Sequence, residues 1–70
     1  MNITINGKRK FLEDELNPPT LLEVIKSLGY NSSLIVIEYN GAILPPSKWK
    51  EQRIQDKDNL EVVTIVGGGS

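Results

Sequence analysis

The carboxyl end of the chain, TIVGGGS (residues 64–70), is the segment whose residue types most suggest chemistry. Three successive glycines offer no side chain, so any reaction there belongs to the main chain and a carboxylate. Taken alone, Gly-Gly-Gly-Ser is also a common flexible linker. The elements that precede this segment must therefore decide between a working arm and a linker.

The remaining side chains exclude several kinds of catalysis. The 70 residues include no Cys and no His, which excludes disulfides, thiolate nucleophiles, imidazole bases and ordinary zinc sites. Asp56 and Asp58 could suggest a metal site, but two carboxylates in a turn more often bond to their own backbone. We therefore predict no metal site, and if the protein takes part in catalysis, we expect another protein to supply the catalytic groups.

Charge and hydropathy predict an ordinary soluble domain. Eight Lys and Arg residues oppose nine Asp and Glu residues, and a net charge of −1 creates no long-range field for nucleic acid or an anionic membrane. No apolar run approaches the roughly 20 residues that span a bilayer, and the first residues lack the order of a signal peptide. We expect a cytoplasmic protein with no nucleic-acid partner and no membrane partner.

The first part of the chain predicts a β-hairpin. Residues 2–6 alternate polar and apolar, and Asn6-Gly7 is a strong hairpin signal because both residues tolerate positive φ. Residues 8–12 form the returning strand, in which Phe11 favours its own side of the pleat as the core side and leaves Arg9 near the edge. The basic run at residues 8–10 is expected to be a solvated edge.

A helix is expected next. Pro18 and Pro19 impose an extended entry, and Thr20 with Glu23 forms a capping box at the start of the helix. Apolar residues then recur at helical spacing, with Leu22 at the margin of the stripe. The stripe consists of Leu21, Val24, Ile25 and Leu28. Gly29 is expected to end the helix in a left-handed conformation.

The second half of the chain predicts three more strands. Residues 34–39 suit a central strand, Asn40-Gly41 a second turn, and residues 42–44 a short strand before two prolines. A polar, irregular segment follows, in which Trp49 and Ile54 are the large anchors; Trp49 is expected to cover the end of a small core. Residues 60–66 form the last strand.

This order of elements predicts an α+β fold, the ubiquitin-like β-grasp. We expect a mixed four- to five-stranded sheet with one main helix packed on one face. The helix is expected to join two strands that can pair in parallel, with right-handed crossover. The first and last strands should be central neighbours. Residues 1–66 then form the domain, and residues 67–70 form a flexible carboxyl-terminal tail.

At the level of motifs the chain resembles the ThiS family of sulfur-carrier proteins of thiazole (thiamine) biosynthesis. The resemblance covers nearly the whole length and depends on the order and spacing of four pieces. These are ITINGK, PTLLEVIKSLG, IVIEYNGAILPPSKW and DKDNLEVVTIVGGG. They include a strand ending in Asn-Gly, a Pro and a Trp a few residues on, an Asp-x-Asp turn, a Glu in the final strand and a glycine ending.

The resemblance implies carriage of sulfur and not catalysis, so the chain would be a protein that partner enzymes act on and not an enzyme. The carboxylate of Gly69 would be adenylated by a ubiquitin-activating-type (ThiF-like) adenylyltransferase that uses MgATP, and the chain itself would bind no cofactor. A persulfide donor would convert the adenylate to a thiocarboxylate, which delivers sulfur to a ThiG-like thiazole synthase. Val66, Gly67 and Gly68 would form the arm that threads into a narrow active site. Glu61, Val63 and Ile65, next to that arm, are the candidate partner-binding surface.

One residue departs from the family pattern, because the sequence ends on Ser70 and not on glycine. Three interpretations are open: Ser70 is removed to expose Gly69, Ser70 is a remnant of cloning, or the chain with Ser70 is adenylated poorly or not at all. The first two are favoured. Two other classes of function stay open from the residues. One is the molybdopterin-synthase small subunit or another ubiquitin-like sulfur carrier. The other is a β-grasp interaction module whose glycines are incidental.

Overall fold

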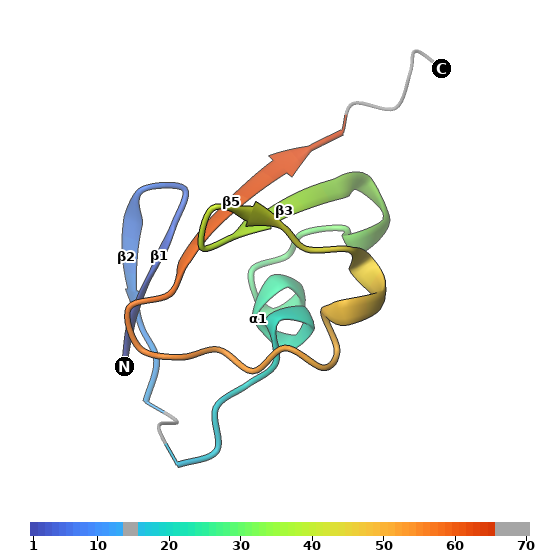
Figure 1. Cartoon of the computed structure of the whole chain (residues 1–70). Helices are drawn as coiled ribbons and strands as arrows, with labels where there is room; N and C mark the ends of the chain where they lie inside the picture. Colours follow the sequence, from blue (N-terminus) through green and yellow to red (C-terminus); the bar gives the residue numbers. More distant parts are fainter. Residues whose placement is uncertain (14–15, 66–70) are drawn as a thin grey trace.

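The computed structural model of the chain describes residues 1–13 and 16–65. It shows a five-stranded sheet with one main helix on one face (Figure 1). The elements are β1 (Asn2–Ile5), β2 (Lys8–Phe11), α1 (Leu21–Ser27), β3 (Ile35–Tyr39), β4 (Ala42–Ile43) and β5 (Asn59–Thr64). Two short 3₁₀ helices, Ser32–Leu34 and Pro46–Lys48, lie in the connections. The predicted ubiquitin-like β-grasp is confirmed.

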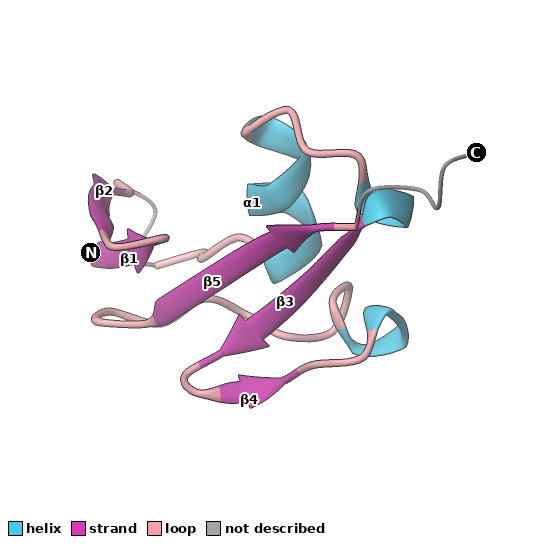
Figure 2. Cartoon of the chain, turned by 90° about the horizontal axis from the view of Figure 1, so that it is seen from above, coloured by secondary structure: helices cyan, strands magenta, loops and turns pink. Residues whose placement is uncertain are grey.

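The strands lie in the order β2-β1-β5-β3-β4. β1 and β5 pair in parallel and the other neighbours pair antiparallel, so the first and last strands are neighbours, as predicted. The two strands that the helix joins run in the same direction, as expected, but they do not pair with each other. α1 connects β2 to β3, and β1 and β5 separate these two strands (Figure 2). β5, the last strand in the sequence, lies between β1 and β3, and its main chain bonds to both.

Both Asn-Gly turns have the predicted geometry. Asn6 and Gly7 have φ of 51° and 80°, and Asn40 and Gly41 have φ of 51° and 90°. Positive φ at both central positions is the conformation of a type I′ turn, whose twist matches that of the strands it connects. The sequence therefore sets both hairpins locally.

The capping box of α1 also forms as predicted. The Thr20 hydroxyl accepts a hydrogen bond from Glu23 N (3.2 Å), and Thr20 N donates to Glu23 Oε1 (2.9 Å). The Thr20 hydroxyl also donates to Glu23 Oε1 (3.0 Å), and the two bonds that the carboxylate accepts, first from Thr20 N and then from this hydroxyl, lower the pKa of Glu23. Gly29, at φ 85°, follows the helix end. Among residues 1–13 and 16–65, no helix is long and apolar enough to cross a membrane.

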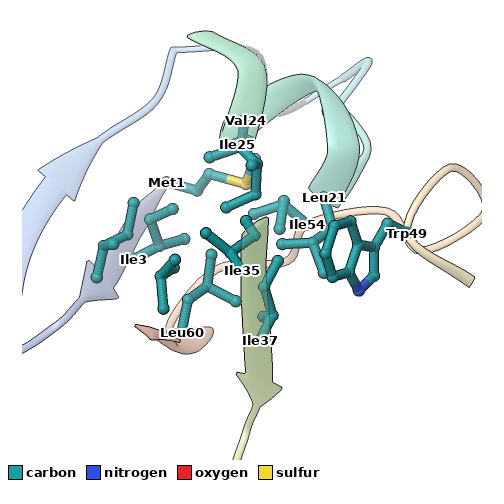
Figure 3. Close-up of a cluster of buried hydrophobic side chains, with 12 residues drawn as sticks. Met1, Ile3, Leu21, Val24, Ile25, Ile35, Ile37, Trp49, Ile54 and Leu60 are labelled. Atoms are coloured by element: carbon teal, nitrogen blue, oxygen red, sulfur yellow. The ribbon is translucent and has the colours of Figure 1, made fainter. Parts of the chain in front are cut away.

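The core lies between α1 and the inner face of the sheet (Figure 3). Leu21, Val24 and Ile25 are buried as the helical spacing predicts, and Leu28 packs against them at the margin. Trp49 and Ile54 are each 1 % exposed and anchor the long connection between β4 and β5. The Trp49 indole N–H donates to the Leu44 carbonyl (2.9 Å), which satisfies its polar atom inside the core.

The prediction for the second strand is wrong about its core side. Phe11 is 63 % exposed on the outer face, the face of the sheet opposite α1. Lys10 and Lys8 pair with Ile3 and Ile5, whose side chains are buried against the helix. Directly paired residues project on the same face, so the register sends both lysines to the helix side. Their aliphatic stems tolerate that position because the ammonium groups still reach water.

Candidate functional site

The carboxyl end of β5 fixes where the glycine segment begins. β5 pairs with β3 from Tyr39↔Leu60 to Ile35↔Thr64, and Ile65 N then donates to the Leu34 carbonyl (2.6 Å). The last described residue is therefore held at the start of β3. The predicted arm (Val66, Gly67, Gly68), the predicted reactive residue Gly69 and Ser70 lie outside the described residues.

The Asn6 side chain holds β5 from its other edge. Asn6 N donates to the Leu60 carbonyl (2.9 Å), and β1 then turns away. Beyond that point, Asn6 Oδ1 accepts from Val62 N (2.7 Å) and Asn6 Nδ2 donates to Val62 O (3.3 Å). A side-chain amide thus replaces one residue of the parallel ladder. Sequence reasoning assigned Asn6 to the turn alone, because its second role depends on a strand 56 positions away.

The three predicted surface residues of β5 lie on the outer face of the sheet. Val63 is 57 % exposed, Ile65 is 48 % exposed and Glu61 is also exposed. Leu60 and Val62, which alternate with them, are buried. The structure therefore brings these three residues together on an open face just before the glycine segment.

Neighbouring strands add residues that the sequence reasoning missed. Val36 pairs with Val63, and Ile43, which is 69 % exposed, pairs with Glu38. We call Val36, Ile43, Val63 and Ile65 the outer-face patch. The sequence contained part of the signal for this patch. Val36 and Glu38 alternate with Ile35 and Ile37, so they must lie on the opposite face of the strand. The register between β3, β4 and β5 was needed to join them.

A pair of carboxylates borders the outer-face patch. Glu38 pairs directly with Glu61 across β3 and β5, and both side chains are exposed. Neither forms an ion pair with any residue in the described part of the chain. Like charges directly opposite each other destabilise a sheet. The arrangement offers a place where a basic group of another protein would relieve the repulsion.

Asp58 organises the other end of β5. It is 5 % exposed, and its carboxylate accepts from Gln55 N (2.7 Å), Asn40 Nδ2 (3.2 Å) and the Tyr39 hydroxyl (2.6 Å). Burial and the Asp58 carboxylate raise the pKa of Tyr39 well above its ordinary value. Asp56 Oδ1 accepts from Asn2 N (2.6 Å). Both aspartates thus bond to main-chain groups, and Asp58 does so within a side-chain network that the sequence did not reveal.

Comparison with known proteins decides the family. The model of the ThiS family matches residues 3–69, which includes all three glycines and leaves out Ser70. The chain belongs to the ThiS family. The family match therefore includes both the β-grasp domain described above and the glycine segment that follows it.

Individual relatives agree with membership of the ThiS family. The chain is 38 % identical to the uncharacterized protein ycf40 of Trieres chinensis, over 93 % of this chain and 85 % of that protein. It is 28 % identical to the sulfur carrier protein ThiS of Bacillus subtilis, over 96 % of this chain and 98 % of that protein. It is also 33 % identical to a thiazole synthase of Paramagnetospirillum magneticum, over 100 % of this chain and 21 % of that protein.

A solved structure of a ThiS protein has the same fold. The thiamine biosynthesis protein ThiS of Geobacter metallireducens superposes with a TM-score of 0.82 at 27 % identity. The match covers 99 % of this chain and 100 % of that protein. The ubiquitin-like sheet and helix are therefore the architecture of the family.

Proposed function

We propose that the chain is a sulfur carrier of thiazole (thiamine) biosynthesis, acted on by partner enzymes, with its chemistry at the Gly69 carboxylate. One observation carries the proposal: the ThiS match runs through the β-grasp domain and continues to residue 69. The bland interpretation of the glycines as a linker does not account for a match that includes them. The ThiS protein of Bacillus subtilis, similar over 96 % of this chain, carries the name sulfur carrier protein.

The proposed reaction begins with activation of a poor electrophile. The Gly69 carboxylate attacks the α-phosphorus of ATP on a ThiF-like adenylyltransferase, which supplies the Mg²⁺, and pyrophosphate leaves. The acyl-adenylate now has AMP as a good leaving group. The terminal sulfur of a persulfide donor displaces AMP, and a thiol cleaves the resulting acyl disulfide to leave the thiocarboxylate. We place this exchange in the cytoplasm, where ATP is available.

Glycine suits the arm because a narrow active site must accept the main chain. Gly67, Gly68 and Gly69 have no Cβ and can adopt conformations that other residues avoid. Val66 connects them to Ile65, which is fixed to Leu34 by its main-chain hydrogen bond (2.6 Å). Because Ile65 is held in place directly before the glycines, a partner that binds the domain can direct the Gly69 carboxylate into its active site.

We propose that the outer-face patch, with Glu61, is the surface that such partners grip. Its apolar side chains are exposed, and the Glu38–Glu61 pair suits a basic group on the partner. A ThiG-like thiazole synthase is the proposed acceptor of the sulfur. The thiazole synthase of Paramagnetospirillum magneticum supports this, because about a fifth of its length (21 %) is similar to the whole of this chain.

Ser70 must be absent for this chemistry. While Ser70 is present, the Gly69 carbonyl is part of a peptide bond and cannot be adenylated as a free carboxylate. The family match ends at Gly69, which supports Gly69 as the reactive residue. We therefore propose that a chain ending at Gly69 is the active form.

ATP–pyrophosphate exchange tests the proposal. Chains ending at Gly69 and at Ser70 are each incubated with a ThiF-like adenylyltransferase, ATP and labelled pyrophosphate. We expect exchange from the Gly69 form and little from the Ser70 form. In a chain ending at Gly69, Gly68→Val should abolish exchange without changing the circular dichroism spectrum. If the Gly69 form gives no exchange with an enzyme that adenylates another ThiS protein, the proposed carrier function is wrong.

A further inference from the structure

The β2 strand is an open edge of the sheet whose free main-chain groups can be assigned from the register. Met1 and Leu12 exchange both main-chain hydrogen bonds, at 2.7 and 2.8 Å. Pairs in an antiparallel ladder alternate between bonded and non-bonded. Arg9 and Phe11 therefore direct their N–H and C=O groups away from β1, and no described residue bonds to them.

A hollow of about 320 Å³ lies beside this edge on the helix side of the sheet. Its apolar lining comes from Ile5, Leu28 and Tyr30, and Lys8 and Lys10 project to the same side because they pair with Ile5 and Ile3. On the opposite side of β2, Phe11 is 63 % exposed. Arg9 pairs with Thr4 and therefore lies on the same outer face as Phe11. The edge thus presents two lysines on the helix side, and Arg9 with an aromatic ring on the outer face.

The basic groups at this edge have no acidic partner in the described part of the chain. The ion pairs there are Lys48–Glu51 and Arg53–Glu23, neither of which includes Lys8, Arg9 or Lys10. These three residues supply three of the eight basic side chains in a protein whose net charge is −1. The β2 edge is thus a local basic region on a slightly acidic molecule.

We propose that the β2 edge binds an extended acidic segment of a partner protein, which adds to the sheet as a further strand. The added strand would bond to the main-chain groups of Arg9 and Phe11. Its alternate side chains would meet Lys8 and Lys10 on one face, and Phe11 with the aliphatic stem of Arg9 on the other. A segment that alternates acidic and apolar residues therefore fits, with its acids toward the hollow.

Charge selects this occupant over others. Lysines on an edge strand disfavour pairing with a second copy of the same strand, because like charges would face each other. The same lysines favour an acidic strand. Nucleic acid fits poorly, since three basic residues on a molecule of net charge −1 give little attraction for a polyanion.

The β2 edge can be occupied together with the outer-face patch. β1 lies between β2 and β5, so a strand added to β2 approaches from the side of the sheet farthest from β4. Strand addition at β2 requires neither the glycine segment nor the sulfur-carrier function, so each can fail while the other holds. Such a second contact would allow a partner to hold the domain while the region after Ile65 is engaged elsewhere.

The binding test uses the full chain labelled with ¹⁵N and a capped peptide of alternating Glu and Val as the probe. We expect chemical-shift changes centred on residues 8–11, and slower amide exchange at Arg9 and Phe11, whose N–H groups become bonded. Lys8→Glu/Lys10→Glu should weaken binding roughly tenfold, through lost exposed ion pairs and new repulsion. That variant should prefer a Lys-Val peptide. Lys48→Glu/Lys50→Glu, with the same change in charge near the opposite edge, should bind as the parent does.

Two further variants separate strand addition from charge alone. Arg9→Pro removes an outward N–H but no bond to β1, so the fold is kept and binding is lost. Arg9→Ala keeps the N–H and should retain most of the affinity. If Lys8→Glu/Lys10→Glu unfolds, Lys8→Gln/Lys10→Gln replaces it. Absence of binding, binding at another edge, or equal affinity in the Lys8/Lys10 and Lys48/Lys50 variants would each overturn strand addition at β2.

Discussion

At the scale of single residues, the paired carboxylates Glu38 and Glu61 are the feature that stability alone does not explain. They lie directly opposite each other, exposed, at the border of the outer-face patch. Repulsion of this kind lowers stability by a few tenths of a kcal/mol or more. A surface that carries such a cost is better explained by a basic partner than by folding.

Glu61→Gln should separate the two effects. Relief of the repulsion should raise the free energy of unfolding by about 0.2–1 kcal/mol at low salt. The rate of ATP–pyrophosphate exchange by the adenylyltransferase should fall, because glutamine at this position offers no negative charge for a basic group of that enzyme. Glu51→Gln, at an exposed position paired only loosely with Lys48 (4.0 Å), is the control and should change neither quantity appreciably. An unchanged exchange rate in Glu61→Gln would argue against Glu61 as a contact.

Tyr39 makes stability depend on pH in the alkaline range. Burial and the Asp58 carboxylate raise its pKa in the folded chain, so the folded state holds the phenol proton more tightly than the unfolded state. The stability from this group is complete below about pH 10 and decreases as pH rises further. Urea titrations between about pH 8 and pH 11 should show this decrease. Tyr39→Phe should be less stable at pH 8, but its stability should decrease less steeply with pH.

At the scale of elements, β5 is fixed on both edges before the glycine segment begins. β3 bonds along one edge, and the Asn6 side chain takes over from β1 along the other, at Val62. Each device is a main-chain requirement, because the N–H and C=O groups of a central strand need partners. A fixed β5 is what gives the following residues a defined starting point.

Asn6→Gly should release one edge of β5. Glycine keeps the positive φ of the turn but leaves Val62 N–H without the 2.7 Å bond, which should cost about 1–3 kcal/mol of stability. Hydrogen exchange at the Val62 amide should become faster. Asn6→Asp, which retains an acceptor and tolerates positive φ, should lose less. Unchanged protection at Val62 in Asn6→Gly would show that the Asn6 bond does not hold the strand.

Local signals explain why most elements could be predicted. Asn-Gly turns, the Thr20–Glu23 capping box and the 3.6-residue spacing of the helix each act within a few residues, and each forms. Phe11 was misplaced because its side of the pleat depends on pairing with β1, where Ile3 and Ile5 determine the core face. Non-local register is what a single sequence specifies least directly.

At the scale of the whole molecule, the two faces of the sheet differ in burial, and we propose that they differ in function. The inner face packs on α1 with Trp49 and Ile54, and the outer face carries Val63 and Ile65. The sequence located the β5 part of the proposed partner-binding surface, because those residues precede the glycines. It could not supply Val36, Glu38 and Ile43, which come beside those residues only through the pairing of β3 with β4 and β5.

Substitutions on the two faces should therefore change different quantities, stability for the inner face and adenylation for the outer face. Trp49→Ala empties a core position and should cost about 3–5 kcal/mol, a large part of the stability of a 70-residue domain. Val63→Ser, on the open face, should change the free energy of unfolding by less than about 0.5 kcal/mol while reducing adenylation. Urea unfolding and pyrophosphate exchange on the same samples measure both. Loss of folding in Val63→Ser would assign Val63 to structure and not to binding.

The central claim is that sulfur is carried on the Gly69 carboxylate. The most direct measurement is the intact mass of a chain ending at Gly69 after incubation with a ThiF-like adenylyltransferase, MgATP, a persulfide donor and a thiol reductant. We predict the mass change of one oxygen replaced by one sulfur, located by fragmentation to Gly69 and absent without ATP. An unchanged mass, when another ThiS protein gains sulfur in the same mixture, or sulfur at a different residue, would contradict the account.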